Sequence, residues 1–382
     1  MTDLALSARE LAFREEVRRW LAANVPREPL PSLETAPGFA AHRGWERILF
    51  DAGLSAVAWP SRYGGRDATL TEWLLFEEEY HAARAPARVG QNGLFLLAPT
   101  LFEHGTEAQR RRFLPGIASG EVVWAQAWSE PEAGSDLAAV RARADRTDGG
   151  WLLSGQKTWS SRAAFADRAF GLFRSDPGAE RHRGLSYFLF PLTAEGVTVR
   201  PIARLDGKPA FAEIFLDSVF VPDEDVVGEV GQGWRVAMST AGSERGLTLR
   251  SPGRFLASAT RLVELWRTEG GGGALRDQVV DCWIAAQAYR LGTFETAARL
   301  TEGGSTGAEA SLGKIFWSEL DIAMHETALE LLGENGELDS GAPDSWTAGY
   351  LFALAGPIYA GTNEIQRTVV AERLLGLPRA DR

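Results

Sequence analysis

The sequence has little cysteine, histidine or lysine, and each scarcity excludes a kind of site. A single cysteine, Cys282, excludes an intramolecular disulfide and a metal site built from several cysteines. The five histidines never pair at the spacing of metal ligands, so we expect no metal. Only three of the 40 basic residues are lysines (Lys157, Lys208 and Lys314), which we attribute first to a GC-rich coding sequence and, in the alternative, to a functional preference for arginine.

The chain also lacks the features of proteins that bind membranes or nucleic acids. No apolar run approaches the roughly 18 residues of a membrane span, and the charged first twenty residues lack the apolar core of a signal peptide. The net charge of −11 argues against nucleic acid or an anionic membrane as the main partner. We therefore expect a soluble cytoplasmic protein.

Several common catalytic motifs are missing. The segment 242–246 (GSERG) does not have the spacing of a G-x-S-x-G nucleophile elbow. The glycine run 270–273 is not followed by Lys-Ser/Thr, so there is no P-loop. The glycines within 228–233 do not spell G-x-G-x-x-G. A dinucleotide bound by this chain is therefore bound without the Rossmann fingerprint.

The 382 residues, 45% of them hydrophobic, suffice for two or three domains. Ser/Thr followed three residues later by Glu/Gln predicts capping boxes at Ser7, Thr69 and Thr106, each opening a helix. After about residue 120 the pattern changes to short β-rich segments with turn clusters between them. These predicted strands are 121–129, 140–146, 151–159, 168–174, 185–192, 197–203 and 211–222.

Helical spacing returns at Gly233 and persists to the end. The predicted helices are 233–268, 275–300, 308–332, 346–355 and 364–375. This order predicts an α+β protein with three domains: an N-terminal helical domain (1–121), a central antiparallel β-sandwich or barrel (122–230) and a C-terminal four-helix bundle (231–382). It does not fit a doubly wound fold, in which strand and helix alternate.

Three segments have an unusual composition: 124–136 (WAQAWSEPEAGSD), 154–161 (SGQKTWSS) and 358–367 (IYAGTNEIQR). Each alone has a structural interpretation, as a bend, a hairpin or an N-capped helix. Their order and spacing together are far more specific.

Together these segments resemble the acyl-CoA dehydrogenase family over essentially the whole chain. SEPEAGSD resembles its T/S-E-P-x-A-G-S-D turn, and SGQKTWSS its N-G-x-K-x-W-I-T strand. Residues 215–234 resemble its F-x-x-V-x-V-P…G-x-x-G-x-G segment, and 358–378 its closing Y-x-G-T-x-E-I-Q-R-x-x-x-A-x-x-L-L-G. The family fold has the same order of domains, which the resemblance therefore implies as well.

The resemblance implies FAD between the β-domain and the C-terminal bundle, and α,β-dehydrogenation of an acyl thioester. By position in the motifs, the implied FAD-binding residues are Gln126, Trp128, Ser129, Gly134, Ser135, Trp159, Ser161, Thr362 and Glu364. The implied substrate-binding residues are Ser135, Arg245, Ala360 and Gly361. The implied partners are an acyl-CoA, an electron-transfer flavoprotein and further subunits, as a homo-oligomer (dimer or tetramer) or a hetero-oligomer.

The position of the catalytic base differs between subsets of this family. Many members carry a glutamate directly before the Gly-Thr of the last motif, where this chain has Ala360. Another subset, which includes isovaleryl-CoA enzymes, carries the base on the first helix of the C-terminal bundle, directly before an arginine, and Glu244-Arg245 matches it. Glu244 is therefore the predicted base. In the alternative, it pairs with Arg245 or caps a turn, although helical neighbours point about 100° apart.

Two family features are not matched. The Arg-x-Phe-Gly segment that reaches a neighbouring subunit's FAD has no counterpart at 268–277 (TEGGGGALRD), and the second glycine cluster is reduced to 331–338 (LLGENGEL). Three alternatives therefore stay open: a non-catalytic partner subunit of a heteromeric dehydrogenase, a flavin oxygenase of the same fold, and an enzyme for carrier-protein thioesters. Ala360 leaves out the volume of a glutamate, which favours branched, cyclic or bulky acyl groups.

Overall fold

The computed structural model describes residues 6–246, 251–304, 307–338, 342 and 344–379. The chain divides into two compact units. The first unit comprises Met1–Pro29, Ala68–Pro86 and Arg245–Arg382, and the second comprises Leu30–Asp67 and Ala87–Glu244. Along the chain, helices come first, then a mostly antiparallel sheet, then helices again, which confirms the predicted fold class.

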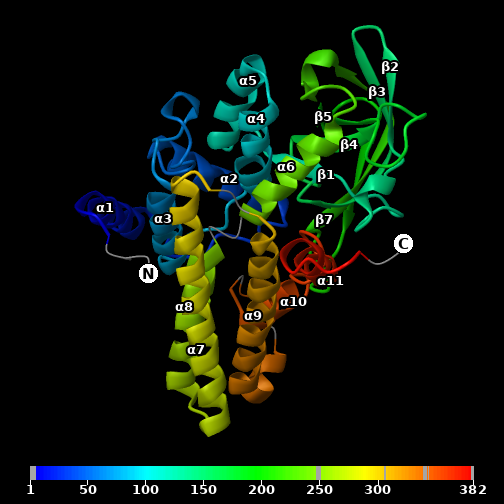
Figure 1. Cartoon of the computed structure of the whole chain (residues 1–382). Coiled ribbons are helices and arrows are strands. Elements are labelled where there is room, and N and C mark those ends of the chain that lie inside the picture. The colour runs from blue at the N-terminus through cyan, green and yellow to red at the C-terminus, as the bar shows by residue number, and fades with distance from the viewer. Residues whose placement is uncertain (1–5, 247–250, 305–306, 339–341, 343, 380–382) are drawn as a thin grey trace. The chain divides into compact units, whose positions relative to one another are not determined.

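The first unit is helical. Its helices are α1 (Ala8–Asn24), α3 (Leu70–Ala82), α7 (Ser251–Glu269), α8 (Gly273–Thr301), α9 (Glu309–Leu332), α10 (Trp346–Ala353) and α11 (Asn363–Val369). The long helices α7, α8 and α9 pack side by side (Figure 1). Their buried faces share a core that includes Phe255, Leu262, Ala286, Trp317 and Met324. The predicted helix 233–268 is described as two helices, and residues 247–250 lie outside the described part.

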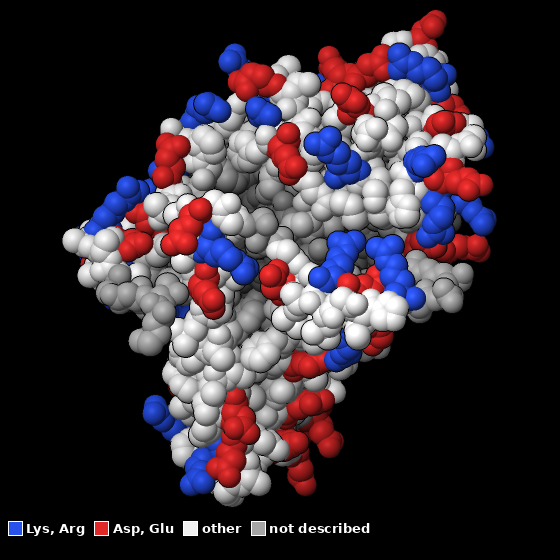
Figure 2. All heavy atoms as spheres, in the orientation of Figure 1, with Lys and Arg blue, Asp and Glu red and all other residues white. Residues whose placement is uncertain are grey.

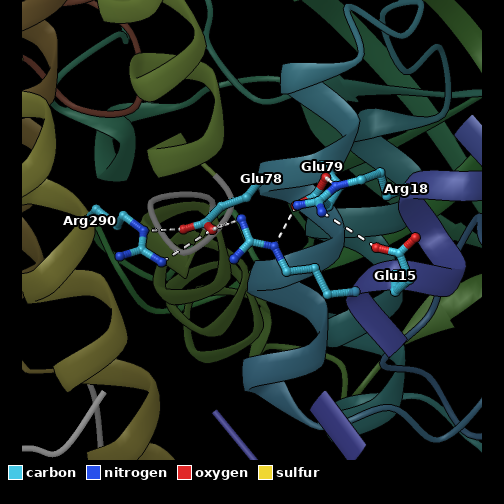
Figure 3. A network of polar contacts seen from close by, with 6 residues as sticks. Glu15, Arg18, Glu78, Glu79 and Arg290 are labelled. Carbon is cyan, nitrogen blue, oxygen red and sulfur yellow. Dashed lines mark hydrogen bonds and ion pairs between the residues drawn. The ribbon is translucent and has the colours of Figure 1, made fainter. Parts of the chain in front are cut away.

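Arginines from two helices neutralise a row of buried carboxylates on α3 (Figure 3). Arg14 and Arg18 of α1 each donate from Nε to the Glu79 carboxylate, at 2.5 and 2.9 Å. Arg290 of α8 donates from Nε to Glu78 Oε1 at 2.5 Å. Because unpaired buried carboxylates are costly, these arginines hold α1 and α8 against α3.

The three predicted capping boxes are present. At the start of α3, the Glu72 backbone N–H donates to Thr69 Oγ1 at 3.1 Å, and the Thr69 N–H donates to Glu72 Oε2 at 2.8 Å. The reciprocal pair satisfies two amides that the helix itself leaves unpaired. The motif therefore fixed each of these helix starts from sequence.

The second unit combines helices with one sheet. Its helices are α2 (Ala36–Asp51), α4 (Ala98–His104), α5 (Glu107–Ala118) and α6 (Gly233–Gly246). Its strands are β1 (Trp124–Ala127), β2 (Arg143–Thr147), β3 (Gly150–Ser161), β4 (Arg168–Arg174), β5 (Leu185–Pro191), β6 (Val197–Ile202), β7 (Phe211–Pro222) and β8 (Val226–Val227). The first seven coincide with the seven predicted segments.

The strands are hydrogen-bonded in the order β6-β7-β3-β2-β4-β5-β8, and β1 pairs with β4 outside this path. The pairings are antiparallel except for β1–β4 and β2–β4, which are parallel. Alternate residues of β7, such as Ala212, Ile214 and Leu216, enter the sheet core. The second of the three unusual segments, 154–161, lies on β3, which forms a long antiparallel pair with β7.

Acidic and basic side chains are mixed over the face of the molecule drawn in Figure 2. Many form short ion pairs, such as Arg47–Asp51 and Arg111–Glu107. Because such exposed pairs contribute little to stability, this surface carries no argument about function.

Candidate active site

The first group of predicted site residues lies in the second unit, on β1 and in the residues after it. Ala125 and Ala127 are buried in the sheet core, so the alternation of the strand directs Gln126 to the other face. Trp128 is 9% exposed and meets Tyr187 edge-on, with 6.4 Å between ring centroids. Its buried Nε1–H has no hydrogen-bond partner among the described residues. An unpaired buried donor costs about 1–3 kcal/mol, so this group points to an acceptor on a ligand.

Strand β3 contains a bulge at the second predicted segment. Between Lys157 and Ser160 the register against β7 shifts by one residue, and Trp159 adopts a left-handed backbone with a φ of 58°. Its indole is 61% exposed and meets Phe211 edge-on at 5.9 Å. Ser161 is half-buried at the end of the strand. Because bulges re-aim side chains, the strained backbone presents a large aromatic surface outside the core.

Two hydrogen bonds bring these segments together. The Thr158 backbone N–H donates to Ser129 O at 2.8 Å, and Lys157 Nζ donates to Trp128 O at 3.3 Å. The residues after β1 therefore lie directly beside the part of β3 that leads into Trp159. Three predicted flavin-binding residues thus share one neighbourhood in this unit.

Gly134 and Ser135 lie just beyond a tight turn. Glu130 and Ala133 exchange backbone hydrogen bonds of 3.1 and 3.0 Å, which close the turn. Gly134 and Ser135 are exposed, and a Cβ added at Gly134 would meet no described atom within 4 Å. Packing within the chain therefore does not require glycine here, and the residue leaves open space beside the turn.

The second group lies in the first unit, in the loop before α11. Ala360 and Gly361 both have left-handed backbones, with φ of 57° and 82°. Gln366 Nε2 donates to their carbonyls at 3.1 and 3.4 Å, and a Cβ at Gly361 would lie 2.4 Å from that nitrogen. Lys314 Nζ donates to Asn363 Oδ1 at 2.7 Å. The shape of this loop is therefore set by side chains of α9 and α11.

Thr362 and Glu364 form the start of α11. Thr362 is the N-cap, and its Oγ1 accepts from the Ile365 backbone N–H at 3.2 Å. Hydrogen bonds from the Glu364 backbone N–H and from the Thr362 hydroxyl lower the pKa of the exposed Glu364 carboxyl. Both side chains thus serve the helix itself, and their predicted contact with a cofactor stays a prediction.

The predicted base lies at the limit of the described structure. Glu244 and Arg245 belong to the last turn of α6 by their backbone. Their side chains lie outside the described part of the chain. Their catalytic and substrate-binding roles therefore stay predictions.

Sequence reasoning missed the groups that support these segments. Lys157 is fully buried, and its Nζ lies 2.7 Å from Glu130 Oε1, although we attributed the scarcity of lysine mainly to codon usage. Gln366 and Asn363 hold the second loop, and they also went unnoticed inside a quoted motif. The rarity of lysine could have indicated Lys157 and Lys314. When a chain uses arginine at almost every basic position, a lysine suggests that the position requires an ammonium group.

Within the described residues, no group of three or more His, Cys, Asp or Glu side chains is arranged to hold a metal ion. No helix in the described ranges is both long and apolar enough to cross a membrane.

Comparison with known proteins identifies the class. Models of the N-terminal, middle and C-terminal domains of acyl-CoA dehydrogenases match residues 7–121, 125–219 and 231–375. The acyl-CoA dehydrogenase IpdE1 of Mycolicibacterium smegmatis is 39% identical, over 96% of this chain and 97% of its own length. The chain belongs to the acyl-CoA dehydrogenase family, and it is an enzyme of that flavin-dependent class.

Solved structures agree with this assignment. The structure described as the Tcur3481-Tcur3483 steroid ACAD is 28% identical with a TM-score of 0.89, covering 99% of this chain and all of that one. The ChsE4-ChsE5 complex from Mycobacterium tuberculosis is 27% identical with a TM-score of 0.84, again covering 99% of this chain and all of the matched one.

The residues of the second unit fit the family's flavin. Trp128 offers a buried N–H that has no partner within the described structure, Gly134 leaves open space, and Trp159 exposes an aromatic face at a strained position. An isoalloxazine ring has polar edges that accept hydrogen bonds and flat faces that stack on aromatics. Each of the three features is what such a group would use.

Proposed function

We propose that this chain binds FAD and converts an acyl-CoA thioester to the 2-enoyl-CoA. When bound, the flavin supplies at N5 the acceptor for the β-hydrogen, which leaves as hydride. The observation that carries the proposal is the hydrogen bond that places Ser129 beside Thr158, next to the exposed indole of Trp159.

The chain's own residues hold the cofactor. The proposed FAD contacts are Gln126, Trp128, Ser129, Gly134, Ser135, Trp159, Ser161, Thr362 and Glu364. Ser129 and Ser161 would donate hydrogen bonds to the polar edge of the ring system, and Trp159 would offer an aromatic surface to its face. The one-residue bulge at Trp159 supports this role, because it re-aims the side chain and leaves the residue exposed.

Glu244 is the proposed base, and it removes the α-proton as the Cα=Cβ bond forms. That proton is weakly acidic, so the enolate oxygen needs hydrogen bonds and the carboxylate must be desolvated. The Ala360 backbone N–H is the proposed donor to the thioester carbonyl. Ser135, Arg245 and Gly361 are the remaining proposed substrate contacts.

Glu244→Gln tests the base. The variant should keep bound flavin but reduce it with thioester about 10² to 10⁴ times more slowly, which is the usual effect of removing a general base. Glu229→Gln, an exposed carboxylate before α6, is the matched control and should reduce flavin at the parental rate. Parental kinetics in Glu244→Gln would remove this residue from the mechanism.

The proposed substrate is a bulky, ring-bearing acyl-CoA. Ala360 leaves out the volume of a glutamate beside the proposed pocket, and one similar structure is described as a steroid enzyme. Comparing kcat/KM for butyryl-, octanoyl-, isobutyryl- and ring-bearing acyl-CoAs tests this. We expect the ring-bearing thioester to have the highest kcat/KM. A difference of one or two methylenes in the acyl group should change transition-state binding by about 1–3 kcal/mol. A clear preference for a linear chain would contradict it.

A second candidate function is one subunit of a two-chain dehydrogenase. Two similar structures are named for pairs of chains, and this chain lacks the usual cross-subunit segment at 268–277. Large apolar side chains are exposed on α8 (Val280, Trp283, Ile284 and Leu291) and on α9 (Leu312 and Phe316). A subunit interface is a common use of such a surface. Measuring the FAD content per chain together with the native mass distinguishes the two candidates. A homo-oligomer of this chain should bind one FAD per chain, and a subunit that needs a second chain should not.

Three further assignments are part of the proposal. Electron-transfer flavoprotein reoxidises the flavin, the location is the cytoplasm, and the domains run over 1–121, 122–230 and 231–382. The bounds of the three matching family domains support this last division. Oxygen consumption by the reduced enzyme would favour an oxygenase instead.

A further inference from the structure

The positions of the three lysines are not random in the structure. Lys157 is 0% exposed and Lys314 is 2% exposed, whereas lysine is almost never fully buried unless it is paired. Apart from Lys208, the chain uses arginine as its cation at all other basic positions, including in the buried pair of Arg88 with Glu46. Codon usage alone therefore does not explain why lysine stands at these two buried positions.

Lys157 has the contacts that an ammonium needs. Its Nζ donates to Glu130 Oε1 and to Leu172 O, both at 2.7 Å, and to Trp128 O at 3.3 Å. The Phe173 ring centroid lies 4.6 Å away. Three donors thus meet three acceptors. A planar guanidinium is larger and spreads its donors in a fork, so arginine cannot reproduce this arrangement.

Glu130 extends the contacts to another strand. Its Oε2 accepts from the Arg141 backbone N–H at 2.7 Å, and its Oε1 also accepts from the Ala142 N–H at 2.9 Å. The pair therefore joins the residues after β1, the two residues directly before β2, the middle of β3 and, through Leu172, β4. Burial lowers the pKa of Lys157, and the nearby Glu130 carboxylate opposes that effect.

Stability alone is a weak reason to keep such a pair. Well-packed apolar residues often replace a buried ion pair without loss of stability, because desolvating two charges is expensive. The pair does, however, fix one position for the Trp128 carbonyl, one residue before Ser129 and beside the bulge. Its effect is geometric, and it falls on the segments proposed to touch the flavin.

We infer that Lys157 is a positioning residue for the flavin site: its ammonium, paired with Glu130, holds the Trp128–Ser129 segment in register with Trp159. The inference rests on the proposed function, since it concerns residues assigned to FAD. Lys157 touches neither cofactor nor substrate in this proposal. It acts through the Trp128 carbonyl and the Glu130 carboxylate.

The test compares two buried ion pairs of the same unit. Lys157→Met/Glu130→Gln removes the positioning pair, and Arg88→Met/Glu46→Gln removes a pair of similar burial as the control. For each, the thermal midpoint of the FAD-free protein, the Kd for FAD and the visible circular dichroism of bound flavin are measured. Lys157→Arg keeps the positive charge but replaces the ammonium with a guanidinium, so it tests whether the site requires the ammonium itself.

We expect the Lys157/Glu130 variant to fold and to bind FAD about 10- to 100-fold more weakly with an altered flavin dichroism, the range known for residues that orient the direct ligands of metal sites. The control should keep the FAD Kd within about twofold even where its midpoint falls, because Arg88 and Glu46 do not hold the Trp128–Ser129 segment and their loss leaves the preorganisation of the site intact. Lys157→Arg should behave like the double variant.

Four results would overturn the inference. One is a folded Lys157/Glu130 variant with the parental Kd and dichroism, while the parent binds FAD. Another is a control that weakens FAD binding equally. If the double variant does not fold, Glu130→Gln alone, which keeps an oxygen for Lys157, decides the matter: an unchanged Kd and dichroism refute positioning, and a weaker Kd supports it. A parent that binds no FAD overturns the proposed function and this inference together.

Discussion

Replacing Trp159 should affect the free energy of unfolding and the affinity for FAD differently. Its φ of 58° costs about 1–2 kcal/mol for a residue other than glycine. With 61% of the residue exposed, about two-fifths of a ~250 Å² side chain is buried, or roughly 100 Å². At about 25 cal/mol per Å² this burial is worth about 2.5 kcal/mol.

Two replacements separate these contributions. Trp159→Ala loses the burial and keeps the strain, so its free energy of unfolding should fall by about 2.5 kcal/mol. Trp159→Gly also releases the strain, at an entropic cost of about 0.5–1 kcal/mol, and should be about 0.5–1 kcal/mol more stable than the alanine variant. Trp151→Ala is the matched control on the same strand, and its 5% exposed side chain should cost about 3–5 kcal/mol.

FAD binding should not follow this order. Both Trp159 variants lose the stacking surface, worth about 1–3 kcal/mol, so Kd should rise about 5- to 150-fold in each. The assays are urea unfolding of the FAD-free protein and titration with FAD followed by flavin fluorescence. An alanine variant at least as stable as the glycine variant would refute the strain argument. Parental FAD affinity in both would refute the role of the indole.

Three further predictions concern other parts of the molecule. Burial is the largest single influence on Glu79 and raises the pKa of its carboxyl, but hydrogen bonds from Arg18 and Arg14 outweigh it and lower the pKa below 4.5. The stability that these hydrogen bonds confer is therefore complete above that pH and is lost as pH falls through the lowered folded-state pKa. In urea unfolding, Glu79→Gln should destabilise the protein at neutral pH and approach the parent progressively as the pH is taken further below 4.5, and a constant difference contradicts this. Lys314→Met should lower the midpoint of thermal unfolding by a few degrees, since a hydrogen bond to a charged group contributes about 1.5–3 kcal/mol, and an unchanged midpoint in calorimetry refutes it. Ile284→Glu on the exposed face of α8 should lower the native mass in sedimentation, because a charge buried in a subunit interface is costly, and an unchanged mass argues that this face is not an interface.

Much of the fold was predictable because it depends on local patterns. The capping boxes at Ser7, Thr69 and Thr106 involve residues three apart, so the sequence carries them directly. The short β-rich segments separated by turn clusters likewise predicted seven strands. The two parallel pairings of β4 were not predicted, because pairing between distant strands depends on the order of the whole sheet.

The site was predictable only as far as its motifs extend. The segments around Ser129 and Trp159 were found by resemblance to a family. The left-handed backbone at Trp159 was not predicted, because the bulge that imposes it arises from the register of β3 against β7. The pair of Lys157 with Glu130 was missed because 27 positions separate the two residues and only the folded sheet brings them together.

The burial of the lysines also determines how the protein responds to amine chemistry. N-hydroxysuccinimide esters and similar reagents attack accessible ammonium groups, and Lys157 and Lys314 are closed to them in the folded state. Lys208, whose side chain is 33% exposed beside Asp206, is the lysine that such reagents can reach. Lysine cross-linkers would therefore report few contacts in any assembly of this chain, however large its interfaces. The same feature makes Lys208 the preferred lysine for attaching a probe or a surface.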